Sequence, residues 1–259
     1  MLQVNDLTVK YDEKDASPVL DSLSFTIGDG EKVALIGANG AGKSTLMLSL
    51  VGVLTPTGGG IVLKHDDETA PEHTHTNSPK KHVHDTVRVD RDHHDRKTIG
   101  QLRSHIGMLF QNPDDQIFMP LVKDDIAFGP ANYKEDPAAT ERRMDEILAR
   151  LGISGLKDRL STKLSDGEKR LVGLAGVLIM NPFILMLDEP FTFLDRRAQR
   201  TLAEILKGLN HTLLLATHDF HLAQNICGRT ILLHKGKVAA DGPSKEILDD
   251  EDLLRRCGL

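Results

Sequence analysis

The sequence predicts an α/β fold in which a mostly β lobe leads into an α/β core that carries a helical subdomain. Short alternating or apolar runs separated by Gly, Asp, Ser and Pro occupy residues 2–10 and 22–36, which is typical of an antiparallel sheet. Apolar residues take helical spacing from about residue 136. Unbroken apolar runs at residues 183–187 and 212–216 are typical of buried parallel strands.

The remaining elements follow from the same kinds of pattern. Residues 61–63 and 106–110 are short runs of strand type, and a polar turn ends the second one. Helical spacing covers residues 136–152. Ser165 is placed to cap a helix that extends to Met180 and contributes to the core. A further helix at 196–208 joins the two buried strands.

The length and composition limit the classes of protein to which the chain can belong. A chain of 259 residues suits one domain, residues 1–259, which we divide into a β lobe with an α/β core (1–111 and 181–259) and a helical subdomain (112–180). The formal net charge of −6 argues against a nucleic-acid partner. The two cysteines, Cys227 and Cys257, lack C-x-x-C spacing and suit a reducing cytosol. We find no signal region and no apolar stretch of about 18 residues.

A phosphate-binding loop follows the strand expected at residues 32–36. Residues 37–44 match the pattern G-x-x-x-x-G-K-[ST] between a strand and a helix. Glycine N–H groups and the helix N-terminus can face phosphate oxygens, Lys43 reaches the β- and γ-phosphates, and Ser44 offers a hydroxyl to Mg²⁺. The predicted triphosphate contacts are Gly37, Ala38, Asn39, Gly40, Ala41, Gly42, Lys43, Ser44 and Thr45.

Two carboxylates follow the apolar run at residues 183–187. Asp188 and Glu189 would lie at the carboxyl end of a buried strand, which is where open α/β sheets bind ligands. Asp188 is suited to hold Mg²⁺, and Glu189 to orient and deprotonate an attacking water. The sequence therefore predicts chemistry on a nucleoside triphosphate.

In the order of its motifs, the sequence resembles the ATP-binding-cassette (ABC) family over nearly the whole chain. The resemblance implies a P-loop ABC ATPase fold with a RecA-like core, and hydrolysis of ATP with Mg²⁺. Besides the phosphate loop and the carboxylates, Tyr11 resembles the aromatic that stacks on adenine, and Gln111 resembles the glutamine that senses Mg²⁺ and water. Leu164–Glu168 resembles the signature, and Phe193–Asp195 resembles the D-loop. Thr217–Asp219 resembles the segment around the switch histidine, which is His218 here.

The resemblance also implies partners. Two such chains pair head to tail, so that Ser165, Gly167 and Asp195 of one chain contact the ATP held by the other. We expect a homodimer that energises transmembrane transporter subunits at the cytoplasmic face of the membrane, as a peripheral subunit. Asp166 stands where the signature usually has Gly, and Phe191 and Phe193 where the D-loop usually has small residues. An anion near the triphosphate predicts slow basal hydrolysis or a need for activation by partners.

Residues 110–118 and 122–130 look like the cobalt/nickel group of energy-coupling-factor transporters. This likeness implies import of nickel or cobalt, with Asp114, Asp115 and Gln116 facing the transmembrane subunit. The alternative for this segment is a capped turn that sets only local geometry. The alternatives for the function are the ATPase of another ABC transporter, or a soluble nucleotide-driven switch that acts on ribosomes or DNA.

Residues 64–97 carry many histidines and almost no apolar side chains, which predicts a surface insertion. In an extended chain, residues i and i+2 share one face, so each His-x-His could bring two imidazoles to one ion. The insertion could therefore bind Ni²⁺, Co²⁺ or Zn²⁺, or it could be a solvated flexible loop without a dedicated ion. The candidate ligands are His73, His75, His82, His84, His93 and His94.

Overall fold

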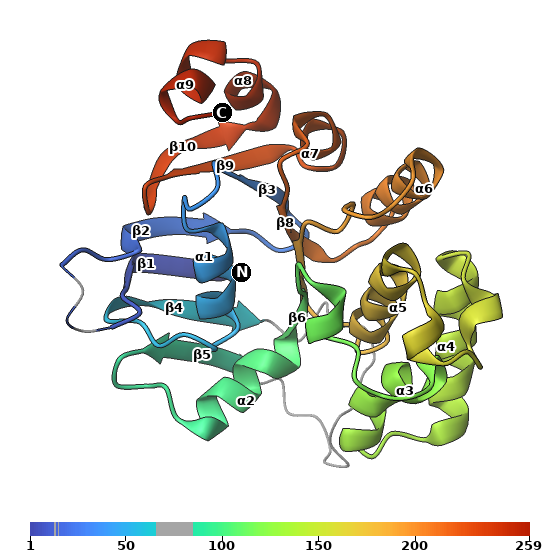
Figure 1. Cartoon of the computed structure of the whole chain (residues 1–259). Coiled ribbons are helices and arrows are strands. Elements are labelled where there is room, and N and C mark those ends of the chain that lie inside the picture. The colour runs from blue at the N-terminus through green and yellow to red at the C-terminus, as the bar shows by residue number, and fades with distance from the viewer. Residues whose placement is uncertain (13, 15, 66–84) are drawn as a thin grey trace.

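The computed structural model describes residues 1–12, 14, 16–65 and 85–259, which form two sheets and a group of helices (Figure 1). One sheet is antiparallel and has the strand order β2-β1-β4-β5. Its bounds are Leu2–Val9 for β1, Leu20–Ile27 for β2, Gly58–His65 for β4 and Asp85–Asp90 for β5. This sheet is the β lobe that the alternating patterns predicted, except that residues 32–36 of the predicted lobe form a parallel strand of the other sheet.

The second sheet has the order β10-β9-β3-β8-β7-β6. Its strands are β3 (Lys32–Ile36), β6 (Ile106–Leu109), β7 (Ile184–Asp188), β8 (Thr212–Ala216), β9 (Arg229–His234) and β10 (Lys237–Pro243). The five strands from β9 to β6 are parallel, and β10 is antiparallel at the edge. Every residue of β7 and β8 is buried, which confirms the prediction of buried parallel strands.

Alternate side chains of this sheet enter two separate cores. In β7, Ile184 and Met186 pack with the β lobe and α1 (Lys43–Leu50), whereas Leu185 and Leu187 pack on the opposite side with the helices. Side chains alternate between the faces of a strand, so both faces of the central sheet must be covered. The sheet is therefore the middle layer between the β lobe and the helices.

The remaining helices divide between a subdomain and the second half of the chain. They are α2 (Arg96–His105), α3 (Val122–Asn132), α4 (Pro137–Arg150), α5 (Asp166–Leu178), α6 (Arg196–Lys207), α7 (Phe220–Ile226), α8 (Ser244–Leu248) and α9 (Glu251–Arg256). Helices α3, α4 and α5 gather on one side of the molecule (Figure 1). Ser165 caps α5 as predicted, but the helix ends at Leu178, two residues before Met180. None of the helices in the described residues is both long and apolar enough to span a lipid bilayer.

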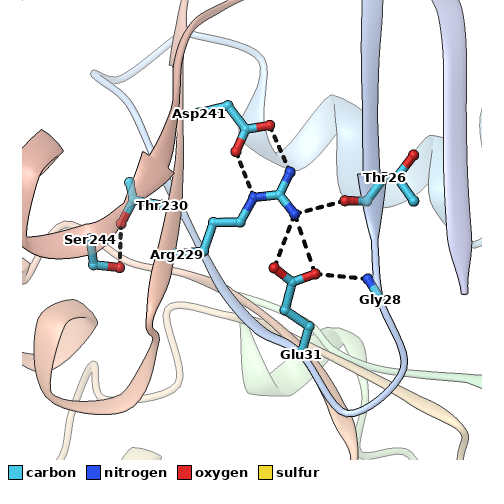
Figure 2. Close-up of polar contacts among 7 residues, drawn as sticks. All are labelled: Thr26, Gly28, Glu31, Arg229, Thr230, Asp241 and Ser244. Carbon is cyan, nitrogen blue, oxygen red and sulfur yellow. Dashed lines mark hydrogen bonds and ion pairs between the residues drawn. The ribbon is translucent and has the colours of Figure 1, made fainter.

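The β lobe is fastened to the central sheet by Arg229 of β9 (Figure 2). Its guanidinium makes a bidentate ion pair with Asp241 of β10, at 2.6 and 2.7 Å, and Nη1 donates to the carbonyl of Thr26 in β2. The same Nη1 contacts Glu31, whose carboxylate accepts from the Gly28 N–H at 2.7 Å. Asp241 and Glu31 raise the pKa of Arg229, so one charge joins the β9–β10 hairpin to residues 26–31, which are about 200 positions away in the sequence.

The boundaries predicted for the histidine-rich insertion are wrong at both ends. β4 extends through His65, and residues 85–90 form β5, which pairs with β4 over six residue pairs. Val87 and Val89 of β5 are buried and alternate with polar residues, so a half-buried strand is possible despite the low apolar content. Asp95 then caps α2. The central part of the predicted insertion, residues 66–84, lies outside the described residues.

Candidate functional site

Four neighbouring parallel strands bring the predicted site residues to one edge of the central sheet. The phosphate loop follows β3, Gln111 follows β6, Asp188 ends β7, and His218 follows β8. The strand ends are in register, since Leu35 pairs with Ala216 and Asp188 pairs with the same residue from the other side. The carboxyl edge of a parallel sheet is the usual ligand position in such folds.

The phosphate loop has a conformation that demands glycine at particular positions. Gly42 is the N-cap of α1 with a φ of 105°, which is strained for a residue with a Cβ. A Cβ on Gly37 would lie 2.6 Å from the carbonyl oxygen of Leu233. Lys43 crosses the loop, and its Nζ donates to the carbonyl of Gly37 at 2.5 Å and to that of Ala38 at 3.3 Å. Burial lowers the pKa of Lys43, while the nearby acids Glu189 and Asp188 oppose this shift.

A cavity of about 370 Å³ opens beside the loop. At its mouth the hydroxyl of Tyr11 lies 2.8 Å from Thr45 Oγ1, and 64% of Tyr11 is exposed. The ring therefore stands close to the loop and accessible to a base, as stacking on adenine requires. The cavity is lined by Tyr11, Val19, Asn39, Gly40, Gly42, Lys43, Ser44, Thr45, Gln111, Asp188 and Glu189.

The first residues of α1 meet the end of β7 in an oxygen-rich pair. Ser44 Oγ donates a hydrogen bond to Asp188 Oδ2 at 3.2 Å. Asp188 is 4% exposed, and burial raises the pKa of its carboxyl, which the hydrogen bond from Ser44 partly opposes. A hydroxyl and a carboxylate on the floor of an open cavity are ligands that Mg²⁺ accepts. The donor set thus fits the metal that the sequence predicts.

Glu189 is held in an unusual backbone conformation, with a φ of 50°. Its N–H donates to the carbonyl of Ala216 at 2.9 Å, and its Oε2 lies 2.9 Å from Nδ1 of His218. Glu189 is 9% exposed, whereas 76% of the His218 side chain is exposed. Strained residues of this kind cluster at functional sites. The Glu189 carboxylate thus lines the cavity and is held by its bond to His218.

The predicted contacts to a second nucleotide do not line this cavity. Ser165 and Glu168 form a capping box at the start of α5, which leaves the exposed N-terminal end of that helix facing outward. A Cβ on Gly167 would lie 2.9 Å from the carbonyl oxygen of Phe193, so the signature packs against the D-loop of its own chain. Asp195 caps α6 through a bond from the Ala198 N–H at 2.8 Å.

The polar turn after Gln111 includes a residue with an internal role that the sequence analysis missed. The Gln116 amide accepts from the Phe110 N–H at 3.1 Å and donates to the carbonyl of Gly173 at 3.3 Å. Asp114 and Asp115 are exposed. A contact with a membrane partner therefore stays a prediction for these two acids, while Gln116 serves the structure of the turn. Its position just after the Asn-Pro turn gave no signal of this role.

Two further residues behind the site were not predicted. Arg170 is completely buried in α5 and bonds to the segment that contains Gln111, and Lys169 bonds to Asp114. The available signal was a basic residue at a helix position where apolar residues recur at helical spacing. An unmatched charge in an apolar pattern indicates a buried polar contact.

Only two of the six predicted metal-binding histidines lie in the described residues. His93 Nδ1 contacts Asp90 at 2.8 Å, and His94 Nδ1 lies 3.3 Å from Thr55 Oγ1. Within the described part of the chain, no three His, Cys, Asp or Glu side chains are grouped to hold a metal ion. The other four, His73, His75, His82 and His84, lie outside the described residues.

Comparison with known proteins identifies the family. The sequence profile of the family described as "ABC transporter" matches residues 20–192, well over half of the chain. The chain belongs to the ABC transporter family. It is therefore an ABC ATPase, which hydrolyses ATP to energise a transporter.

The chain is similar to several curated relatives over its full length. It is 41% identical to a putative ABC transporter ATP-binding protein of Geobacter sulfurreducens, covering 100% of this chain and 93% of the relative. It is 36% identical to the energy-coupling factor transporter ATP-binding protein EcfA of Methanothermobacter thermautotrophicus, covering 100% of this chain and 76% of the relative.

Solved structures share the fold. CbiO1 from Clostridium perfringens, described as part of the ABC transporter complex CbiONQ, superimposes with a TM-score of 0.75 and 33% identity over 98% of this chain and 93% of its own. The cassette MJ0796, a dimer bound to ADP and phosphate, has a TM-score of 0.78 at 23% identity over 94% of this chain and 99% of its own. The second likeness shows the fold alone, and both agree with the predicted P-loop ABC ATPase fold.

Proposed function

We propose that this chain is the ATPase subunit of a membrane importer for nickel or cobalt, acting as a head-to-tail homodimer on the cytoplasmic face of the membrane. The observation that carries the dimer is the separation of two groups of residues. The phosphate loop and its carboxylates line one cavity, whereas Ser165, which is exposed at the start of α5, and the half-buried Gly167 beside it do not line that cavity. A second chain would supply the missing cover for each site.

Within one chain, the residues around the cavity have distinct tasks. The phosphate loop and Lys43 bind the triphosphate, and Tyr11 stacks on the base. Ser44, Asp188 and Gln111 would hold Mg²⁺, which neutralises charge on the phosphates when it is bound. Positioning and charge neutralisation are most of what phosphoryl transfer requires from a protein.

Hydrolysis also needs a water molecule that is oriented and deprotonated. Glu189 lines the cavity and its Oε2 is bonded to His218, so its second oxygen can accept a proton from water in the cavity. His218 holds the carboxylate in place and stands at the exposed surface, where the end of the other chain's α5 would meet it. Ser165, Gly167 and Asp195 of that chain would then complete the site around the γ-phosphate.

The proposed ion rests on the likeness of residues 110–118 and 122–130 to the cobalt/nickel group, and the names of two relatives support the transporter type. EcfA is an energy-coupling factor subunit by name, and CbiO1 belongs to a CbiONQ complex. Near the exposed acids Asp114 and Asp115, Phe118 and Phe128 form an edge-to-face pair with ring centroids 4.8 Å apart, and both rings are exposed. Exposed aromatic rings beside charges suit a protein partner. The second candidate, the ATPase of another ABC transporter, is supported by the relative of Geobacter sulfurreducens, whose name gives only an ABC transporter.

Reconstitution with the membrane subunits would test this function. The chain should copurify with transmembrane proteins, and vesicles that contain the complex should take up radioactive Ni²⁺ or Co²⁺ only with ATP. The matched control is the complex with Glu189→Gln, which should bind ATP but not transport. Uptake of neither ion, with uptake of another substrate, would favour the second candidate. Recovery of ribosomes or DNA without membrane proteins would refute both.

Metal binding by the histidine-rich segment needs a separate experiment. His65 and Asp85 pair directly across β4 and β5, so residues 66–84 can be replaced by a two-residue Asn-Gly turn without removing either strand. We expect the full chain to bind Ni²⁺, Co²⁺ or Zn²⁺ more strongly than the shortened chain in a calorimetric titration. Equal binding by the two chains would refute a metal site in this segment.

A further inference from the structure

Stability alone does not explain why a charged side chain, Arg170, is buried in α5. It lies near the start of α5 and is the largest completely buried side chain of the described residues. Its Nη1 and Nη2 donate to the backbone carbonyls of Phe110 and Gln111, and its Nε is buried without a partner in the described part of the chain. A buried guanidinium with few acceptors is less favourable than an apolar side chain of similar volume.

Two more contacts fasten the same segment to the same helix. Lys169 Nζ lies 2.6 Å from Asp114 Oδ1, and only 18% of the lysine side chain is exposed. Gln116 bonds both to the N–H of Phe110 and to the carbonyl of Gly173, one turn further along α5. Residues 110–116 are therefore joined to the first two turns of α5 at three positions, Lys169, Arg170 and Gly173. They are expected to move as one unit.

The two ends of this unit face two different nucleotides. Gln111 lines the ATP cavity of its own chain. Ser165 precedes Arg170 by five residues, or about 7.5 Å along a helix axis, and lies at the exposed end of α5. In the proposed dimer this end meets the ATP of the partner. A rigid helix connects the two positions.

Electrostatics support the same connection. Burial lowers the pKa of Arg170, and the carboxylates of Asp188 and Glu189 oppose this shift by favouring the charged guanidinium. Arg170 therefore sits within the field of the catalytic acids while it holds the backbone of Gln111. Its charge lies behind the site and does not contact the cavity.

We propose that Arg170 is a positioning residue through which closure of α5 on the partner's ATP sets the position of Gln111 at the chain's own ATP. This inference rests on the head-to-tail dimer proposed above. Coupling between two sites is reciprocal, so the two ATP sites of the dimer should act cooperatively. Wild-type ATPase activity should then depend on ATP concentration with a Hill coefficient above one.

The test compares Arg170→Met, Arg170→Lys and a control. Arg170→Met fills the same space with an apolar side chain but removes the hydrogen bonds to the carbonyls of Phe110 and Gln111. It should lower kcat about tenfold and bring the Hill coefficient to about one, with ATP affinity and ATP-driven dimerisation retained. Arg170→Lys keeps a charged donor and should restore part of kcat and of the cooperativity.

The matched control is Lys157→Met, in the same subdomain. The ion pairs of Lys157 are with Glu141 and Asp145 of α4, at 3.0 and 2.7 Å, so kcat and the Hill coefficient should stay at wild-type values. Wild-type kinetics in Arg170→Met would overturn the proposal. It would also be overturned if Arg170→Met and Arg170→Lys lost kcat, ATP affinity and thermal stability to the same extent, because that pattern indicates a structural role only.

A double-mutant cycle tests the same unit without touching the buried residue. Lys169→Met and Asp114→Asn each break the ion pair between these two side chains, and both variants should fold. The double variant should show the same reduced cooperativity as either single variant, whereas additive effects would contradict the coupling. A wild type that binds ATP but never dimerises would instead refute the proposed dimer.

Discussion

The phosphate-binding edge of the sheet and the exposed end of α5 present their functional groups in opposite ways. At the edge, Asp188 and Glu189 are almost fully buried and bonded to Ser44 and His218. At the end of α5, 59% of the Asp166 side chain is exposed. Groups that are fixed in a low-dielectric setting act strongly without further ordering, whereas exposed groups are weakened by solvent. The edge is therefore organised within one chain, and the α5 end gains its strength only when another surface covers it.

The largest effect should come from Glu189→Gln, which removes the proton acceptor from the edge. A general base contributes about 10²–10⁴ in rate, so we expect kcat to fall about 1000-fold with unchanged ATP affinity. Phosphate release and a nucleotide-binding titration measure the two quantities. Glu204→Gln, an exposed acid of α6, is the control and should keep the wild-type rate. A fall of less than tenfold would show that another group accepts the proton.

Ser165→Ala tests the exposed end and should have the next largest effect. The change removes the cap of α5, which costs about 1 kcal/mol of stability, and also the hydroxyl expected to reach the partner's γ-phosphate. We expect about tenfold weaker ATP-driven dimerisation, measured by sedimentation.

Asp136→Ala is the matched control for Ser165→Ala. Asp136 caps α4 through a bond from the Ala139 N–H at 3.0 Å, so its loss should lower stability by a similar amount, about 1 kcal/mol. Dimerisation should not change, because the start of α4 is not part of the proposed contact. If both variants weakened dimerisation equally, the effect would come from the stability of the helical subdomain.

Asp188→Asn should separate stability from function at the buried edge. Burial raises the pKa of Asp188 above its value in the unfolded chain. The protonated form therefore stabilises the fold fully when the pH is below the pKa of the unfolded chain. This stability is lost as the pH rises through the higher pKa of the folded chain. At neutral pH the neutral amide should raise the melting temperature of the nucleotide-free protein by about 2–4 °C while lowering ATPase activity. The gain should disappear in acid. A lower melting temperature at neutral pH would mean that the bond with Ser44 outweighs burial.

The smallest effect should come from Asp166→Gly at the exposed end. A unit charge about 10 Å from another in water contributes about 0.4 kcal/mol, or about a twofold change in rate. Lys169 Nζ lies 3.9 Å from Asp166 Oδ1 but only 2.6 Å from Asp114, so it offsets the aspartate incompletely. Basal ATPase activity should therefore rise about twofold, and less at high salt. An unchanged rate at low salt would remove Asp166 as the cause of slow hydrolysis.

The two regions also differ in how far the sequence predicted them. The phosphate loop, Asp188 and Glu189 were found because their chemistry needs fixed residue types next to strands with a clear apolar pattern. β5 was missed because a strand with one buried face needs only alternate apolar residues, and Val87 and Val89 were hidden among charges. The contacts of Gln116 were missed because their partners, Phe110 and Gly173, lie on different elements.

The sequence by itself determined which nucleotide chemistry the chain performs, since local spacing fixes a glycine turn, a lysine and a helix N-terminus on a few consecutive residues. It also determined the buried strands and the cap at Ser165, because these depend on neighbours in the chain. Only the tertiary structure decided that Arg229 joins the β9–β10 hairpin to residues 26–31, and that Arg170 joins α5 to the backbone of Gln111. Both contacts connect residues that are at least about 60 positions apart, and no local pattern carries the distance between them.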